Sequence, residues 1–159
     1  MARKADLPVS WTVKRRDIVA AARSFIGVPY RHQGRSVRGV DCSGLVLLVA
    51  AKLNIPMKDS PTAYSNQPTG AQLVAPCEEQ CWRPDDQGSL VPGDLVVFWG
   101  PTPREPQHFA FIGDGVNGPT MIHSFSKFDK VLEHGWNRFW REHYSARYWL
   151  AGTEEEYVS

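Results

Sequence analysis

The chain has 159 residues, of which 42% are apolar and 22% are charged. This composition suits one ordinary domain with its own core and excludes disorder along the whole chain. The formal net charge is +1 at pH 7, so we expect no nucleic-acid partner. No apolar run approaches the roughly 18 residues of a membrane-spanning helix, so we also expect no membrane span.

The first residues, MARKADLPVSW, lack the apolar core of a secretory signal peptide. We therefore expect synthesis in the cytoplasm, with another component carrying the protein to any site outside the cell. Residues 1–12 are interpreted as a flexible N-terminal arm, residues 13–152 as a single domain, and residues 153–159 as an acidic C-terminal tail.

Two helices are predicted in the first third of the chain. Residues 13–26 place Ile18, Ala22 and Phe25 on one face, which is the pattern of an amphipathic helix. Residues 43–53 are apolar nearly all round, which is typical of a buried helix.

The middle of the chain is predicted to be mostly loop, because residues 56–92 hold six prolines. Within this segment, Leu73, Cys77 and Cys81 recur at intervals of four, which places them on one face of a further helix. We expect Pro76 to open or kink that helix.

The last third of the chain has the pattern of strands. Candidate strands are residues 95–99, 108–115, 120–126 and 130–136, and the turn-rich sequence between the second and third predicts a hairpin. Aromatic residues at positions 136, 140, 144 and 148 then indicate a short helix leading into a last strand. Since helices come first and an antiparallel sheet second, the predicted fold class is α+β.

Cys42 stands at the start of the apolar helix rather than inside it. The unpaired N–H groups and the dipole of a helix N-terminus favour a negative charge, which lowers the pKa of a thiol placed there. Gly44 allows another backbone segment or a substrate to come close. The position therefore predicts a nucleophilic cysteine with a lowered pKa.

A nucleophilic cysteine needs a base and usually a third group that orients the base. His108 opens one strand of the predicted hairpin and His123 lies on the other. If the two strands pair, His123 can hold the His108 imidazole in the correct tautomer. Taken singly, such cysteines and histidines are more often structural, and it is their combination that favours a catalytic site.

Cys77 and Cys81 are four positions apart, a spacing that also occurs in metal sites. Zinc would need two further ligands, and no second ligand pair stands nearby in the sequence. We interpret both cysteines as packing residues and expect no metal and no cofactor.

Several segments resemble, in order, the NlpC-type cysteine peptidases, papain-like enzymes that cut the peptide stems of the bacterial cell wall. The matching segments are PYRHQG, GVDCSGL, LVPGDLVVF, the histidine of HFAFIGDG, and MIHSF. The resemblance covers roughly residues 16–150. It implies a papain-like NlpC-type fold in which N-terminal helices, with the nucleophile at a buried helix N-terminus, pack on an antiparallel sheet.

Carried over position by position, the resemblance makes Cys42 the nucleophile, His108 the general base and acid, and His123 the orienting residue. The 15 positions between the two histidines exceed the usual gap in the family, because VNGPT lengthens the hairpin.

The resemblance also implies groups that contact the substrate. Tyr30 would orient the substrate or stabilise the oxyanion through its hydroxyl, together with the backbone N–H of Cys42. Asp41 and Ser43, on either side of the nucleophile, would contact the free amine or the backbone of the substrate.

PYRHQGRSVRGVDCSGLV and the closing SARYWLAG resemble more closely the compact branch of the family found in phage tails and gene-transfer particles. This implies a peptidoglycan endopeptidase of the virion tail, with a stem peptide as substrate and tail-tip or baseplate proteins as partners. It would be synthesised in the bacterial cytoplasm and act in the cell wall. The open alternative is a structural tail-tip component that keeps the peptidase fold and mainly binds proteins.

Overall fold

The computed structural model describes residues 8–59, 70–100 and 106–159. The helices are α1 (Arg15–Arg23), α2 (Cys42–Lys52), α3 (Gly70–Gln80), α4 (Arg138–Glu142) and the 3-10 helix η1 (Ser126–Phe128). The strands are β1 (Arg35–Ser36), β2 (Gly39–Val40), β3 (Cys81–Trp82), β4 (Leu95–Trp99), β5 (Pro106–Gly115), β6 (Gly118–Phe125), β7 (Lys130–Gly135) and β8 (Tyr144–Leu150).

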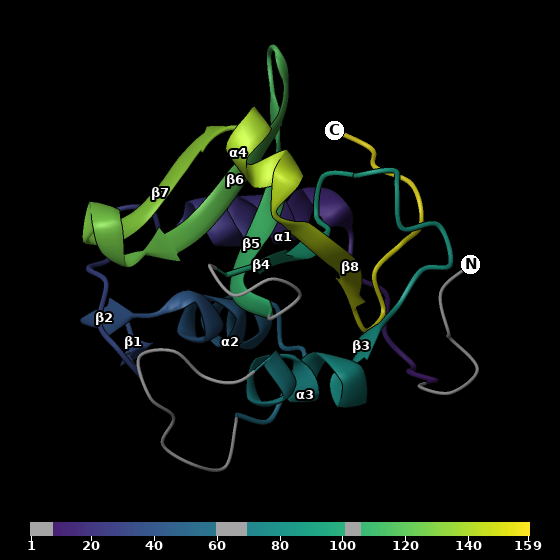
Figure 1. Ribbon diagram of the computed structural model, residues 1–159. Coiled ribbons are helices and arrows are strands. Elements are labelled where there is room, and N and C mark those ends of the chain that lie inside the picture. Colours follow the sequence, from purple (N-terminus) through teal and green to yellow (C-terminus); the bar gives the residue numbers. More distant parts are fainter. Residues whose placement is uncertain (1–7, 60–69, 101–105) are drawn as a thin grey trace.

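Six of the strands form one antiparallel sheet in the order β3-β8-β4-β5-β6-β7, and β1 pairs with β2 in a small separate hairpin. Figure 1 shows α1 and α2 against the sheet, with α4 beside β6 on its other side. The predicted α+β class is confirmed, because helices precede an antiparallel sheet that they cover.

The alternation of side chains along the strands divides the core between the two faces of the sheet. Phe109 and Phe111 of β5 pack with the apolar residues of α1 and α2, whereas Ala110 and Ile112 pack with Trp140 of α4 on the opposite face. Helix α2 lies deep in the first of these clusters, as its nearly uniform apolar sequence predicted.

Two predicted elements end earlier than expected. Helix α1 stops at Arg23, because the chain turns and reaches Gly27, which has a φ of 96° in the left-handed region. Helix α3 ends at Gln80 with Pro76 inside it, so Cys81 does not share its helical face. Cys81 instead begins β3 and pairs with Leu150 of β8.

The predicted hairpin of β5 and β6 is confirmed, and its strands are longer than expected. Phe111 lies opposite Ile122, and the pairing continues without a shift to Gly115 opposite Gly118. The extra residues between the two histidines are therefore paired strand rather than loop, so they leave the register near the histidines unchanged.

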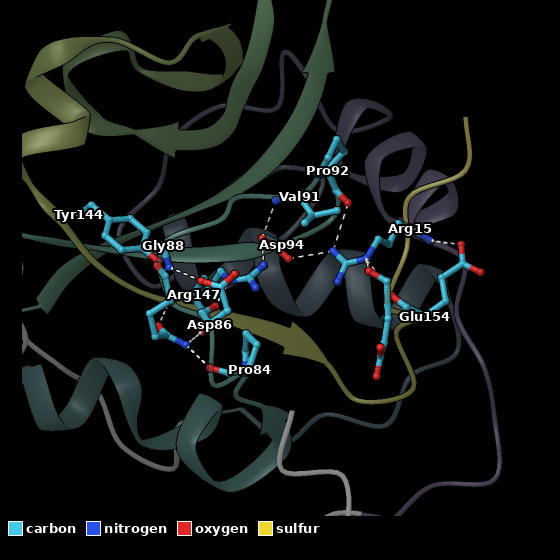
Figure 2. Close-up of polar contacts among 12 residues, drawn as sticks. Arg15, Pro84, Asp86, Gly88, Val91, Pro92, Asp94, Tyr144, Arg147 and Glu154 are labelled. Carbon is cyan, nitrogen blue, oxygen red and sulfur yellow. Dashed lines mark hydrogen bonds and ion pairs between the residues drawn. The ribbon is translucent and has the colours of Figure 1, made fainter. Parts of the chain in front are cut away.

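A buried ion-pair cluster joins the start of α1, the start of β4 and the last strand. The carboxylate of Asp94 accepts hydrogen bonds of 2.8 Å from Arg15 and from Arg147. Figure 2 shows the two guanidinium groups converging on this carboxylate from opposite sides. Asp94 and Arg15 are both 0% exposed, so this charge cluster is held entirely within the protein.

Both ends of the described chain contact the domain. Val13 forms a β-bridge with Thr153, and the indole N–H of Trp11 donates to the carbonyl of Ala151. The Nε atom of Arg15 donates to the carbonyl of Glu154. Residues on both sides of the expected domain boundaries thus pack against the sheet, while residues 1–7 of the expected arm lie outside the described residues.

Candidate active site

Asp41 and Cys42 occupy the first turn of α2. Asp41 is the N-cap, and its Oδ1 atom accepts a hydrogen bond of 2.8 Å from the N–H of Gly44. This side chain satisfies one of the free N–H groups at the helix start. Cys42 follows as the first helical residue, so its predicted place at a helix N-terminus is confirmed.

The small β1–β2 hairpin lies directly against this turn. Arg35 donates to the Oδ1 atom of Asp41 at 2.8 Å, and the N–H of Gln33 donates to Oδ2 at 3.0 Å. A Cβ atom at Gly44 would lie only 2.1 Å from the carbonyl oxygen of Gly34. Gly44 therefore permits the close approach of backbone that its sequence position predicted, and the hairpin fixes the cysteine turn from outside.

The Cys42 side chain is half-buried beside the start of β5. Its sulfur accepts hydrogen bonds from the N–H of Phe109 and from Ser43. Burial, and then the negative charge of Asp41, outweigh these donors and raise the pKa of the thiol to about 12. The expected lowering of this pKa is wrong, because loss of water around the sulfur costs a thiolate more than the helix terminus returns.

The two predicted histidines meet across β5 and β6. The Nε2 atom of His108 lies 2.6 Å from the Nδ1 atom of His123. His108 shares a cleft with Cys42, whereas His123 does not line that cleft and is fully buried. Burial lowers the pKa of His108 to about 3 and that of His123 to about 2, so both rings are neutral at neutral pH. With Nε2 engaged by His123, Nδ1 is the nitrogen of His108 left for the thiol.

A third histidine extends this pair and was not predicted. The Nε2 atom of His134, on β7, lies 2.7 Å from the Nε2 atom of His123. No role for His134 was expected from the sequence, because its place beside His123 depends on how two strands pair. The usable signal was the antiparallel pairing of β6 and β7, which sets Met121 opposite His134 and so places His123 on the same face.

The cleft around Cys42 and His108 has a volume of about 520 Å³. Its lining comes from the cysteine turn and Tyr30, and also from the start of β5, from η1 and from α4. Aromatic residues line much of it: Tyr30, Trp99, Phe125, Phe139 and Trp140. The cleft is large enough to hold part of a peptide with the reacting bond beside the sulfur.

The three other predicted site residues also line this cleft. Burial raises the pKa of the Tyr30 hydroxyl, and the nearby charges of Cys42 and Asp41 raise it further. Ser43 donates to the sulfur. Asp41 is 4% exposed and caps the helix, which makes it a support for the cysteine turn. The substrate contacts expected of all three stay predictions.

No three side chains of His, Cys, Asp or Glu within residues 8–59, 70–100 and 106–159 form a group suited to a metal ion. Cys77 and Cys81 are free and buried in the core. The pKa of the Cys77 thiol is raised by its contact with Cys81 and by burial. Among the same described residues, no helix has the length and apolar character needed to cross a membrane.

The sequence profile of the NlpC/P60 family matches residues 27–150, a span that includes the whole cleft framework from Tyr30 to β8. The chain belongs to the NlpC/P60 family. Its family resemblance, expected from the motifs around Cys42 and Asp94, is thereby confirmed at the level of the family.

Curated relatives of this NlpC/P60 chain are longer proteins. The chain is 32% identical to the "Probable endopeptidase Rv2190c" of Mycobacterium tuberculosis over 108 residues, which cover 67% of this chain and 22% of that protein. It is 34% identical to the "Probable endopeptidase NlpC" of Escherichia coli over 79 residues, which cover 48% of this chain and 41% of that protein. The matched region thus spans less than half the length of either relative.

Solved structures of the family share the fold. An NlpC/P60 family protein from Bacillus cereus superposes with a TM-score of 0.65 at 23% identity, covering 88% of this chain and 41% of that one. The NlpC/P60 domain of the peptidoglycan hydrolase SagA superposes with a TM-score of 0.57 at 24% identity, covering 86% and 98%. The predicted papain-like NlpC-type fold is confirmed.

Proposed function

We propose that this protein is a cysteine endopeptidase that hydrolyses an amide bond in the stem peptides of peptidoglycan. The observation that carries the proposal is the placement of Cys42 and His108 in one cleft, with His123 in contact with the Nε2 atom of His108. Membership of the NlpC/P60 family supports the substrate class. The names of the relatives, an endopeptidase and a peptidoglycan hydrolase, agree with it.

The resting site holds a neutral thiol and a neutral imidazole, because burial raises the pKa of Cys42 and lowers that of His108. The proton therefore moves from Sγ to Nδ1 of His108 as the sulfur attacks the amide carbonyl, rather than before the substrate binds. His108 then gives this proton to the leaving amine as the carbon–nitrogen bond breaks. The products of this half-reaction are a thioester at Cys42 and a free amine.

Hydrolysis of the thioester repeats the same proton transfers with water as the nucleophile. His108 takes a proton from the water as its oxygen attacks the carbonyl carbon, and returns it to the sulfur as the carbon–sulfur bond breaks. In both halves a negative charge develops on the carbonyl oxygen. We assign its stabilisation to the backbone N–H of Cys42 and to the hydroxyl of Tyr30, which lines the same cleft.

We extend the proposal to a setting in a phage tail, where the enzyme would open the cell wall locally after synthesis in the bacterial cytoplasm. The support is the resemblance of residues 29–46 and of the segment SARYWLAG to the phage and gene-transfer-particle branch. Tail-tip or baseplate proteins would be its partners. Detection of the protein in purified virions, by mass spectrometry of tail fractions, tests this part, and its absence from tails would remove it.

Digestion of purified sacculi tests the activity. The wild-type protein is expected to release soluble muropeptides, and Cys42→Ala is expected to release none while keeping its melting temperature within a few degrees. Cys81→Ala is the matched control. Cys81 is buried in β3 and does not line the cleft, so its loss leaves the reacting groups in place. Mass spectrometry of the products identifies the cleaved bond.

The result that would overturn the proposal is a folded wild-type protein that leaves sacculi from several bacteria intact. Retained binding to a tail protein in that case would favour the alternative of a structural tail-tip component. Equal activity in wild type and Cys42→Ala would instead show a hydrolase that does not use this sulfur.

A further inference from the structure

Three imidazole rings lie in a row that begins in the cleft at His108 and ends on a backbone carbonyl. His108 contacts His123 at 2.6 Å between Nε2 and Nδ1, and His123 contacts His134 at 2.7 Å between their Nε2 atoms. The Nδ1 atom of His134 then lies 2.9 Å from the carbonyl oxygen of Gly135. Each contact has hydrogen-bond length, so each needs one proton and one lone pair.

The carbonyl of Gly135 fixes where the protons lie. A carbonyl oxygen only accepts, so the Nδ1 atom of His134 carries a proton and donates it. In a neutral His134 ring the Nε2 atom then has only a lone pair, and His123 must donate to it. The Nδ1 atom of His123 is left as an acceptor, so Nε2 of His108 donates to it. The remaining nitrogen of His108, Nδ1, is thus an unprotonated base.

We propose that His134 is a positioning residue that sets the tautomer of His108 through His123. The inference rests on the proposed function, since an unprotonated Nδ1 of His108 is what the attack of Cys42 requires. His134 itself touches neither the sulfur nor the cleft, and its effect passes through a ring that is fully buried. Because His123 is buried, water cannot take the place of His134 as its hydrogen-bond partner.

The surrounding aromatic groups keep the three rings in place. Trp140 of α4 lies 5.4, 5.3 and 6.2 Å, between ring centroids, from His108, His123 and His134 respectively. Phe128 of η1 lies 6.5 Å from His134. The rings facing His134 are His123 of β6, Phe128 of η1 and Trp140 of α4, and Met121 of β6 lies opposite it in the sheet. Of these groups only His123 is titratable, and it leads on to His108. Glu133, its charged neighbour on β7, is bound instead by Arg23 and Thr120.

The same geometry predicts what a donor at position 134 would do. A group that only donates would force the Nε2 atom of His123 to accept, which moves its proton to Nδ1. His123 would then donate to Nε2 of His108, and the proton of His108 would move to Nδ1, where it blocks uptake of the thiol proton.

A pair of variants of opposite hydrogen-bonding character separates this role from simple packing. In His134→Glu the carboxylate only accepts, and in His134→Lys the ammonium only donates. Both remove the imidazole and its ring contacts, so a purely structural role of His134 predicts similar defects in the two. Lys130→Gln, a change at an exposed residue of the same strand, serves as the control for β7.

Long-range proton–nitrogen correlation spectra of the full chain, labelled with nitrogen-15 at histidine, report the tautomer of each ring without any substrate. Wild type, His134→Glu and Lys130→Gln are expected to show His108 protonated at Nε2, and His134→Lys to show it protonated at Nδ1. The rate of Cys42 alkylation by iodoacetamide, followed by peptide mass spectrometry, is the second measurement. A wrong tautomer costs about 10⁴-fold in serine-protease triads, so we expect the Lys variant to lose more than about tenfold and the Glu variant to stay near wild type.

Protonation of Nδ1 of His108 in the wild-type protein at neutral pH would overturn the proposal. This measurement does not depend on any variant folding. Equal tautomers or equal alkylation rates in folded Glu and Lys variants would overturn it as well. Neither measurement uses peptidoglycan. A wild type with the expected tautomers that fails to digest sacculi would therefore contradict the proposed function and leave the role of His134 standing.

Discussion

Gly44 of α2 faces the carbonyl oxygen of Gly34 so closely that a Cβ atom at position 44 would lie 2.1 Å from it. The contact joins the first turn of the cysteine helix to the β1–β2 hairpin, beside the hydrogen bonds that Asp41 accepts from Gly44 and from Arg35. The position of the sulfur therefore depends on a helix residue having no side chain.

Gly44→Ala is expected to destabilise the protein, although alanine is favoured over glycine within a helix by about 1 kcal/mol. The added methyl group must push backbone atoms apart, and overpacking of this kind costs about 1–3 kcal/mol. The shift also moves Cys42, so muropeptide release should fall even under conditions in which the variant is fully folded. Urea unfolding of the variant measures the free energy.

Gly88→Ala is the matched control for that change, because its Cβ would meet nothing closer than 3.7 Å. We expect it to unfold near the wild-type urea concentration. If Gly44→Ala proves as stable and as active as Gly88→Ala, the close approach of the hairpin is not what holds the cysteine turn.

Asp94→Ala is expected to be among the most destabilising single changes in the chain. It would leave Arg15, which is 0% exposed, and Arg147 as buried charges without their carboxylate, and breaking a buried pair in this way costs about 3–5 kcal/mol. Thermal and urea unfolding measure the loss. Glu142→Ala breaks an exposed ion pair with Arg138 on α4 instead, for which we expect less than about 1 kcal/mol. Similar losses in the two variants would contradict the assigned importance of the cluster.

Asp41→Asn is expected to lower the pKa of the Cys42 thiol. After burial, the charge of Asp41 is the main cause that raises this pKa, and the amide oxygen of asparagine can still accept from the N–H of Gly44. Thiolate formation should therefore begin at lower pH, which the pH dependence of iodoacetamide labelling at Cys42 measures. Asp59→Asn removes the other carboxylate bound by Arg35 and is expected to leave the labelling curve in place. An unchanged or raised labelling midpoint in Asp41→Asn would count against this account.

The stability of the protein is expected to fall as the pH falls from about 6.5 toward 3. Burial lowers the pKa of His123 to about 2 in the folded protein, whereas an unfolded histidine has a pKa of about 6.5. In this window the unfolded chain binds a proton that the folded chain excludes, so stability is full above the unfolded pKa and decreases below it. In this window each buried histidine with such a lowered pKa reduces the free energy of unfolding by about 1 kcal/mol per pH unit.

His123→Gln removes one of these rings and should make the decrease shallower by that amount between pH 6 and pH 4. Urea unfolding at a series of pH values measures both curves, and Lys130→Gln should run parallel to wild type. Parallel curves for wild type and His123→Gln would show that the ring takes up its proton inside the folded protein.

Local sequence patterns were sufficient for much of the site. The cap of Asp41 and the helix start at Cys42 depend on residues within four positions of each other, so the sequence alone indicated a thiol at a helix terminus. The two-residue turn of the β5–β6 hairpin sets which residues face each other, and this brought His108 and His123 together as predicted. Contacts made by neighbours in the chain, or across a tight hairpin, leave a periodic or positional signal.

Other features depended on the assembled fold. The third ring of the histidine row came from β7, whose pairing with β6 had to be known before His134 could be placed beside His123. The partners of Asp94 came from α1 and β8, which lie far from it in the sequence. The pKa of Cys42 was predicted in the wrong direction, because the helix terminus is a local property whereas burial is produced by every segment that packs around the sulfur. The sequence determined which groups are the candidates for the chemistry and their order along the chain. Tertiary packing decided their charge and their proton positions, because removal of water and distant hydrogen-bond partners arise only when remote segments meet.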